Sequence, residues 1–122
     1  MLMRFIELKK HLNEKQFYAC YQLLGDDAFL LQTAIRQFSA VNNGFEQFNH
    51  DIKEFNSIAE LVDSCNIFPL YVEHRLVVAR NFKLNIEHLK PYLQAPNKST
   101  ILILEVYKEP DDYKKLIKKY CI

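Results

Sequence analysis

The sequence predicts an α/β fold in which a mainly parallel sheet lies between two layers of helices, a three-layer αβα arrangement. Two observations support this prediction. Apolar runs that suit strands buried on both faces recur along the chain, at Phe17–Leu24, Arg75–Arg80 and Ser99–Tyr107. Segments with apolar residues at helical spacing separate these runs, which is the order expected of repeated βαβ units.

Length and composition fit one globular domain over residues 1–122. The chain is 49% hydrophobic and carries a net charge of +1, so no overall basic field favours nucleic acid as the main ligand. Three widely spaced cysteines are too few for a disulfide framework and indicate a reducing, cytoplasmic location. Because no run approaches the roughly 20 apolar residues of a membrane span, we expect a soluble protein without a membrane partner.

The first elements predicted are a helix, a strand and a second helix. Apolar residues at helical spacing predict an amphipathic helix over residues 2–13, and Phe17–Leu24 follows as a buried strand that ends at Gly25. Asp26 and Asp27 then supply the oxygen acceptors and negative charge that favour a helix N-terminus. This is the strand, turn and helix that open an α/β unit.

The second helix continues to Val41, where apolar positions at steps of three and four end before two asparagines and a glycine. Phe45–Phe48 is a candidate for a short strand. Ser57 and Glu60 then form a capping-box pattern, in which each side chain can accept a hydrogen bond from a backbone amide. A helix over residues 58–65 follows from this cap and from the apolar stripe behind it.

The last part of the chain repeats the alternation of strand and helix. Arg75–Arg80 has an apolar, branched centre typical of a buried strand, and a short helix with Pro91 near its start follows. Ser99–Tyr107 is the next strand. Pro110 then opens a final helix whose lysines lie toward its C-terminal end, where they favour the helix dipole.

The turn after the first strand lacks the features of a phosphate-binding loop. Such a loop needs successive glycines and a lysine, whereas Gly25 is followed by Asp26 and Asp27, whose charges oppose a phosphate. After the second buried strand, where a nucleotide hydrolase places an acid that holds magnesium, the chain has Arg80 and Asn81. We therefore expect no nucleotide cofactor and no ATP hydrolysis.

Other catalytic patterns are also missing. The four histidines show no ligand spacing with each other or with a cysteine, so we expect no metal site. No serine lies in a nucleophile-elbow sequence, and Cys20 falls inside a predicted buried strand. The sequence therefore favours a protein that is not an enzyme.

A loop with exposed apolar potential precedes the second buried strand. Pro69 removes a backbone donor and restricts its neighbour, so the segment around it is predicted to be a loop. Leu70 and Tyr71 on such a loop either fold back onto the core or are held out for a partner. Ile67 and Phe68 are expected to belong to the core.

Three stretches of the chain together suggest a family. They are G-D-D-x-F-L-L after the first strand, P-L-Y-x-x-x-R-L-V-V before the next buried strand, and the proline-bearing turn before the last strand. With these motifs the whole chain resembles the N-terminal domain of the delta subunit of bacterial DNA polymerase III, a clamp-loader subunit. The resemblance implies a RecA-like, AAA+-type P-loop fold whose nucleotide site has degenerated at Gly25, Asp26 and Asp27. It also implies that the chain is a fragment of a longer subunit.

The resemblance further implies a binding role for the proline loop. In this family a hydrophobic pair in that loop inserts into a pocket of the sliding clamp and helps to open its ring, and by position the pair is Leu70 and Tyr71. The family more often has phenylalanine at the second place, so the Tyr71 hydroxyl must find water or an acceptor at the pocket rim. Glu73, His74 and Arg75 are candidates for contacts at that rim, and are otherwise expected to be solvated.

The partners implied are the sliding clamp (the beta subunit), other clamp-loader subunits through regions absent here, and DNA only indirectly. Two other functions stay open. One is a small P-loop-like nucleotide-binding ATPase domain. The other is a nucleic-acid module that uses the lysines of the final helix, although a solvated helix face is the ordinary interpretation of such lysines.

Overall fold

The computed structural model describes residues 18–25, 28–41, 50–69 and 74–107. The helices predicted over residues 2–13 and after Pro110 lie outside these ranges, and so does the strand candidate Phe45–Phe48.

The described strands form one parallel sheet in the order β1-β4-β3-β2. The strands are β1 (Cys20–Leu24), β2 (His50–Lys53), β3 (Arg75–Ala79) and β4 (Thr100–Val106). Three of them match the apolar runs in the sequence, with ends that differ by three residues at most. The prediction of an α/β fold with a parallel sheet is confirmed.

Strand β2 is the one that the sequence pattern missed. Among the described strands it lies at an edge of the sheet and pairs with β3 alone, and its four residues are half-buried or exposed. The sequence of this strand, HDIK, contains a single apolar residue. An edge strand has no need of a continuous apolar run, which is the signal used to find the other strands.

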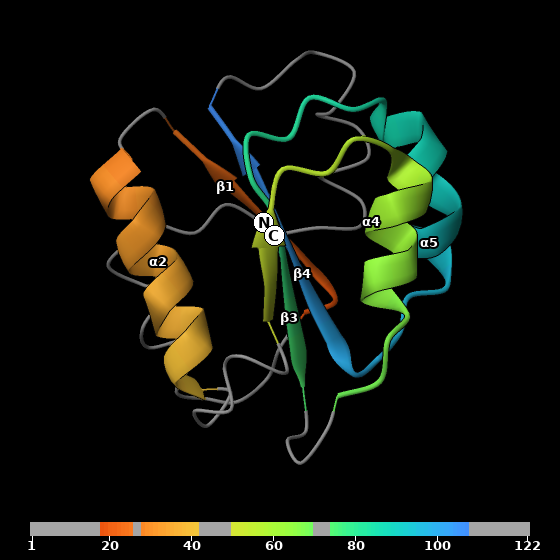
Figure 1. The fold of residues 1–122 in the computed structure, drawn as a ribbon, viewed down its shortest axis with the longest axis horizontal. Coiled ribbons are helices and arrows are strands. Elements are labelled where there is room, and N and C mark those ends of the chain that lie inside the picture. The colour runs from red at the N-terminus through yellow and green to blue at the C-terminus, as the bar shows by residue number, and fades with distance from the viewer. Residues whose placement is uncertain (1–17, 26–27, 42–49, 70–73, 108–122) are drawn as a thin grey trace.

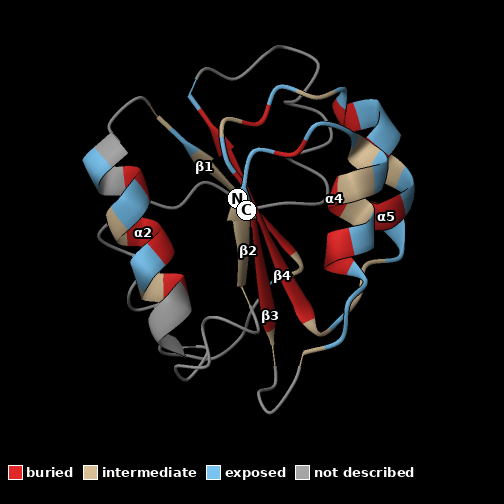
Figure 2. Cartoon of the chain, in the orientation of Figure 1, coloured by how far each residue is buried: buried red, intermediate tan, exposed pale blue. Residues whose placement is uncertain are grey.

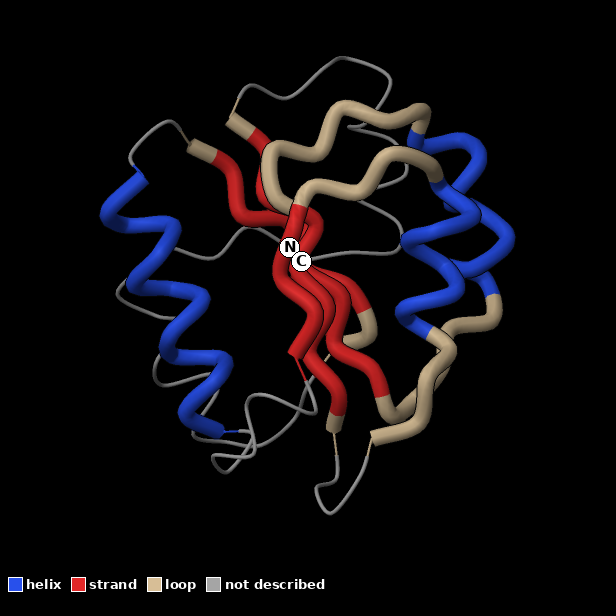
Figure 3. Tube along the Cα trace, in the orientation of Figure 1, coloured by secondary structure: helices blue, strands red, loops and turns tan. Residues whose placement is uncertain are grey.

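Helices cover both faces of the sheet (Figures 1 and 3). Helix α2 (Ala28–Val41) lies on one face. Helix α4 (Ile58–Cys65), the short 3₁₀ helix η1 (Ile86–Leu89) and helix α5 (Lys90–Gln94) lie on the other. Among the described residues, no helix is both long and apolar enough to cross a membrane.

The two central strands separate two layers of core (Figure 2). All residues of β3 and β4 are buried, and their side chains alternate between the faces. Leu76 and Val78 pack in the layer beneath α2, whereas Val77 and Ala79 pack with residues of α4, η1 and α5. Each fully buried aliphatic side chain contributes about 1.5 to 3 kcal/mol through the hydrophobic effect.

Local sequence signals explain how α4 and α5 begin. The Ser57 hydroxyl accepts a hydrogen bond from the Glu60 amide at 3.1 Å, as the capping box predicts. The Glu60 carboxylate accepts from the Asn56 amide at 3.4 Å and pairs with Lys53 Nζ at 2.7 Å. Pro91 stands in the first turn of α5, where its missing N–H leaves no hydrogen bond unmade.

An aromatic contact joins β1 to α2. The Phe38 side chain is fully buried and meets the Tyr21 ring edge to face, with ring centroids 4.9 Å apart. The Tyr21 hydroxyl accepts a hydrogen bond from the Tyr18 amide at 3.1 Å, and burial raises the pKa of Tyr21 to about 12. This pair anchors α2 to the first strand.

Replacing Phe38 with alanine is expected to lower the free energy of unfolding by about 3 to 5 kcal/mol, because it removes a fully buried ring and leaves a cavity. Denaturant titration followed by circular dichroism measures the change. Gln32→Ala, on the exposed side of the same helix, is the matched control and should change stability by less than about 0.5 kcal/mol. Equal effects of the two substitutions would contradict the assignment of Phe38 to the core.

Candidate functional site

Two large apolar side chains are exposed directly after helix α4. Ile67 is 52% exposed and Phe68 is 74% exposed. The sequence analysis placed both in the core, and that prediction is wrong. The buried stripe of α4 ends at Cys65, and the chain leaves the helix at Asn66, so the next two side chains no longer follow the helical period that turned the stripe inward. Neighbouring apolar residues exposed at this level suit a surface that meets a partner.

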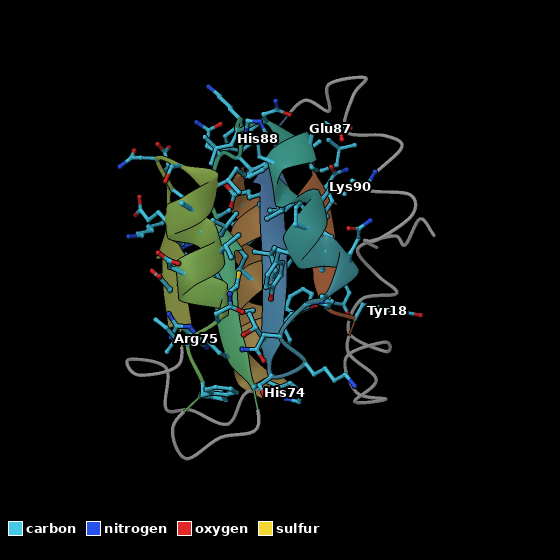
Figure 4. The ribbon with its side chains drawn as sticks, turned by 90° about the vertical axis from the view of Figure 1, so that its right-hand side faces the viewer. Tyr18, His74, Arg75, Glu87, His88 and Lys90 are labelled. Carbon is cyan, nitrogen blue, oxygen red and sulfur yellow. The ribbon has the colours of Figure 1, made fainter. Side chains whose placement is uncertain are left out.

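The residues predicted to form the binding pair, Leu70 and Tyr71, lie outside the described residues, as does Glu73. Their assignment therefore stays a prediction. His74 is described and half-buried, and it lies with Arg75 at the end of the molecule opposite Glu87 and His88 (Figure 4).

The sequence analysis expected Arg75 to be on the surface, and that prediction is wrong. Its residue is 6% exposed, and its Nε donates a hydrogen bond to the Ser64 carbonyl at 2.9 Å. As the first residue of β3, Arg75 shares the strand face of Val77 and Ala79, which packs toward α4. The strand alternation therefore carries its side chain inward, and a solvated position at a clamp rim is excluded for the guanidinium.

A polar cluster surrounds the Arg75 guanidinium. Its Nη2 donates to the Ser64 hydroxyl at 3.0 Å and lies 3.7 Å from Asp51 Oδ2. The Ser64 hydroxyl in turn donates to Asp51 Oδ2. The cluster thus joins the start of β3 to the last turn of α4 and to the edge strand β2, and the Asp51 carboxylate balances the buried positive charge.

Two further groups hold the end of α4. The Cys65 carbonyl accepts hydrogen bonds from Thr100 Oγ1 at 2.6 Å and from Asn97 Nδ2 at 3.1 Å. The Asn66 amide bonds back to the Val62 carbonyl at 3.1 Å. The carbonyl groups that a helix end leaves without intrahelical partners are therefore satisfied, and the point where the chain turns toward Ile67 is fixed to β3 and β4.

The opposite end of the sheet carries the residues expected at a degenerate phosphate site. Gly25 has φ of +152°, a backbone conformation that residues other than glycine rarely adopt. Its amide donates a hydrogen bond to the Val106 carbonyl at 3.0 Å. This amide is therefore engaged by β4. Asp26 and Asp27 lie outside the described residues, and a P-loop relationship stays a prediction.

After β3, Arg80 is exposed and Asn81 adopts a left-handed φ of 49°, with its side-chain amide donating to Glu54 Oε1 at 3.4 Å. Within the described ranges, no group of three or more histidine, cysteine or acidic side chains is placed to hold a metal ion.

Comparison with known proteins decides the family. Residues 21–121 match the family model for DNA polymerase III, delta subunit. The chain belongs to this family. The DNA polymerase III subunit delta of Bacillus subtilis strain 168 is 28% identical over 127 aligned residues, which cover 89% of this chain and 36% of that protein. The chain therefore spans little more than a third of the length of this relative.

A solved structure shares the fold. The DNA clamp loader delta protein of Bacillus subtilis superposes with a TM-score of 0.83 at 24% identity, over 98% of this chain and 41% of that one. The resemblance to the delta subunit seen in the sequence motifs is confirmed by the family match. The parallel sheet with helices on both faces is the architecture shared with this structure.

Burial at the end of α4 gives this delta-family chain a measurable dependence on alkaline pH. Cys65 is fully buried, and burial raises the pKa of its thiol from 9.0 to about 12. The unfolded chain therefore loses the thiol proton first, so this stabilisation is complete below pH 9 and declines as the pH rises toward 12. At pH 10 the loss amounts to about 1.4 kcal/mol of unfolding free energy.

Denaturant titrations between pH 8 and pH 10.5 test this dependence. The Cys65→Ala variant should be less stable at pH 8, because the replacement leaves a small cavity, but its stability should fall less steeply with pH than that of the unchanged chain. Parallel pH profiles of the two proteins would contradict the assignment to Cys65.

Proposed function

We propose that this chain is the clamp-binding N-terminal part of a clamp-loader delta subunit, and that it binds the sliding clamp through the apolar residues that follow helix α4. The observation that supports this proposal most directly is the 74% exposure of Phe68, with Ile67 beside it at 52%. Leu70 and Tyr71, the pair assigned by the family resemblance, follow in the sequence after Pro69. The similarity to a protein named DNA clamp loader delta protein supports the same partner.

The energetics are adequate for a compact contact. Burial of one large apolar side chain in a partner pocket contributes about 1.5 to 3 kcal/mol, so a few such residues can dominate a modest interface. Pro69 restricts the backbone before binding and so reduces the entropy lost on binding. The Tyr71 hydroxyl needs a hydrogen-bond acceptor or water at the pocket rim.

Clamp opening requires more than affinity. A bound protein shifts the closed and open states of a ring only by the difference between its affinities for the two states. We propose that this chain contributes to opening because its apolar residues bind the clamp more tightly when the ring is open. Other clamp-loader subunits would be bound through regions outside these 122 residues. The assembly would work in the cytoplasm, and this chain would contact DNA only indirectly.

The proposed role does not include ATP hydrolysis. The chain has one glycine at the turn after β1, with its amide bonded to Val106, and it has Arg80 and Asn81 where a hydrolase places a magnesium-binding acid.

Isothermal titration with ATP and magnesium is expected to give no binding heat, because neither the phosphates nor the metal has the usual protein groups to hold it. The same titration with ADP is the companion measurement. Appreciable heat from either nucleotide would favour the alternative, a small P-loop-like ATPase domain.

Replacing Leu70 and Tyr71 together with alanine should weaken binding to a bacterial sliding clamp by roughly tenfold or more, because each side chain would lose its burial in the clamp. Phe68→Ala should weaken it as well. Surface plasmon resonance on immobilised clamp gives the affinities, and circular dichroism verifies that the variants fold.

Phe29→Ala is the matched control for Phe68→Ala. Phe29 is 72% exposed but lies on α2, on the other side of the sheet, so its replacement should leave clamp affinity unchanged. Unchanged affinity of the Leu70 and Tyr71 double variant would reject the proposed contact. Binding to nucleic acid that falls steeply with salt would instead favour the lysines of the predicted last helix.

A further inference from the structure

Buried polar residues are concentrated at one place in the described part of the chain. The described part of the chain contains four buried polar or charged residues. Three of them, Ser64, Arg75 and Thr100, meet at the C-terminal end of helix α4. Arg75 and Thr100 donate to the Ser64 and Cys65 carbonyls, which the end of the helix leaves without intrahelical partners. Their concentration at the point where the chain leaves α4 indicates that the geometry of this exit is controlled.

Helix α4 depends on this control, because its own sequence provides little of it. No basic residue lies in its last turn, although the negative end of a helix dipole is stabilised by a nearby cation. Arg75 supplies that cation from β3. Its Nε bonds to the Ser64 carbonyl at 2.9 Å, and the same carbonyl accepts the Ile67 amide at 3.3 Å. The arginine and the first exposed apolar residue thus share one acceptor.

We propose that Arg75 is a positioning residue for the clamp contact, which holds the end of α4 against β3 so that Ile67 and Phe68 leave the helix in one fixed direction. This inference rests on the proposed function. The guanidinium is buried and does not reach the clamp itself. It acts by reducing the number of conformations that the segment after α4 samples before binding, which lowers the entropic cost of association.

Arg75 acts together with its neighbours. Asp51 on β2 and the Ser64 hydroxyl fix the guanidinium plane through Nη2, while Nε remains available to the Ser64 carbonyl. A lysine at this position would keep the charge, but it could not make the two directed contacts that a guanidinium makes.

The test combines hydrogen exchange with clamp binding. In Arg75→Met, the amides of Asn66 and Ile67 should exchange with solvent roughly tenfold faster or more, and clamp affinity should fall roughly three- to tenfold. Arg75→Lys should show the same two effects to a smaller extent. Arg80→Met is the matched control, since it removes the same charge from an exposed residue that follows the same strand, and it should change neither quantity.

Ser64→Ala provides a second route if Arg75→Met does not fold. It removes the hydroxyl that links Arg75 to Asp51 and keeps a residue that favours the helix. It should speed exchange at Ile67 and weaken clamp binding in the same direction. The proposal would be overturned if a folded Arg75 variant kept the amide exchange rates and the clamp affinity of the unchanged chain. If only Ser64→Ala folds, the same result in that variant would overturn it.

The two proposals fail in different ways. If the unchanged chain does not bind the clamp, the proposed function and the role of Arg75 in clamp binding both fail, whereas loss of protection at Asn66 and Ile67 in Arg75→Met would still show that Arg75 fixes the end of α4. If the unchanged chain binds but Arg75→Met binds equally well, the positioning role fails and the clamp contact stands.

Discussion

The buried hydrogen bonds at the C-terminal end of helix α4 are the interaction on which the proposed contact depends. A helix that ends inside a folded domain must satisfy its last carbonyl groups, because a buried carbonyl without a partner costs about 1 to 3 kcal/mol. Here the partners come from two strands: Arg75 opens β3 and Thr100 opens β4. The same contacts that stabilise the helix therefore determine where Ile67 and Phe68 are exposed.

The parallel sheet places this contact far from the position of a nucleotide site. In parallel α/β sheets ligands bind beyond the carboxyl ends of the strands. In this chain Gly25 and Asn81 lie at that end of the sheet. The last turn of α4 and the described residues after it, 66–69, lie at the other end of the sheet, near Arg75 at the start of β3. The exposed residues Ile67 and Phe68 are thus separate from Gly25 at the turn after β1.

Much of the fold follows from local patterns in the sequence. The strands β1, β3 and β4 were predictable because central strands in a parallel sheet must be apolar on both faces, and α4 because Ser57 and Glu60 mark its start. Strand β2 was missed because an edge strand can be half-buried and polar. A strand that is buried on both faces has a continuous apolar run that can be recognised in the sequence, whereas a half-buried strand such as β2 has none.

The candidate site was less predictable, since its geometry depends on contacts between distant parts of the chain. Nothing in the sequence near Arg75 shows that Ser64, eleven positions earlier, accepts its hydrogen bonds, and the arginine was expected to be solvated. Phe68 was expected in the core because large apolar residues usually lie there. Its exposure depends on where α4 ends, and at that end Arg75 of β3 and Thr100 of β4 bond to the last carbonyl groups beside the local Asn66 and Ile67 amides.

Photo-cross-linking tests the proposed clamp contact most directly. A benzoylphenylalanine replaces Phe68 in one preparation and Phe29 in another, and each is irradiated with a bacterial sliding clamp. We expect a covalent adduct with the clamp from position 68 and none from position 29, although the two phenylalanines are almost equally exposed. An adduct from position 29 alone, or from neither position at clamp concentrations that give binding, would contradict the contact after α4.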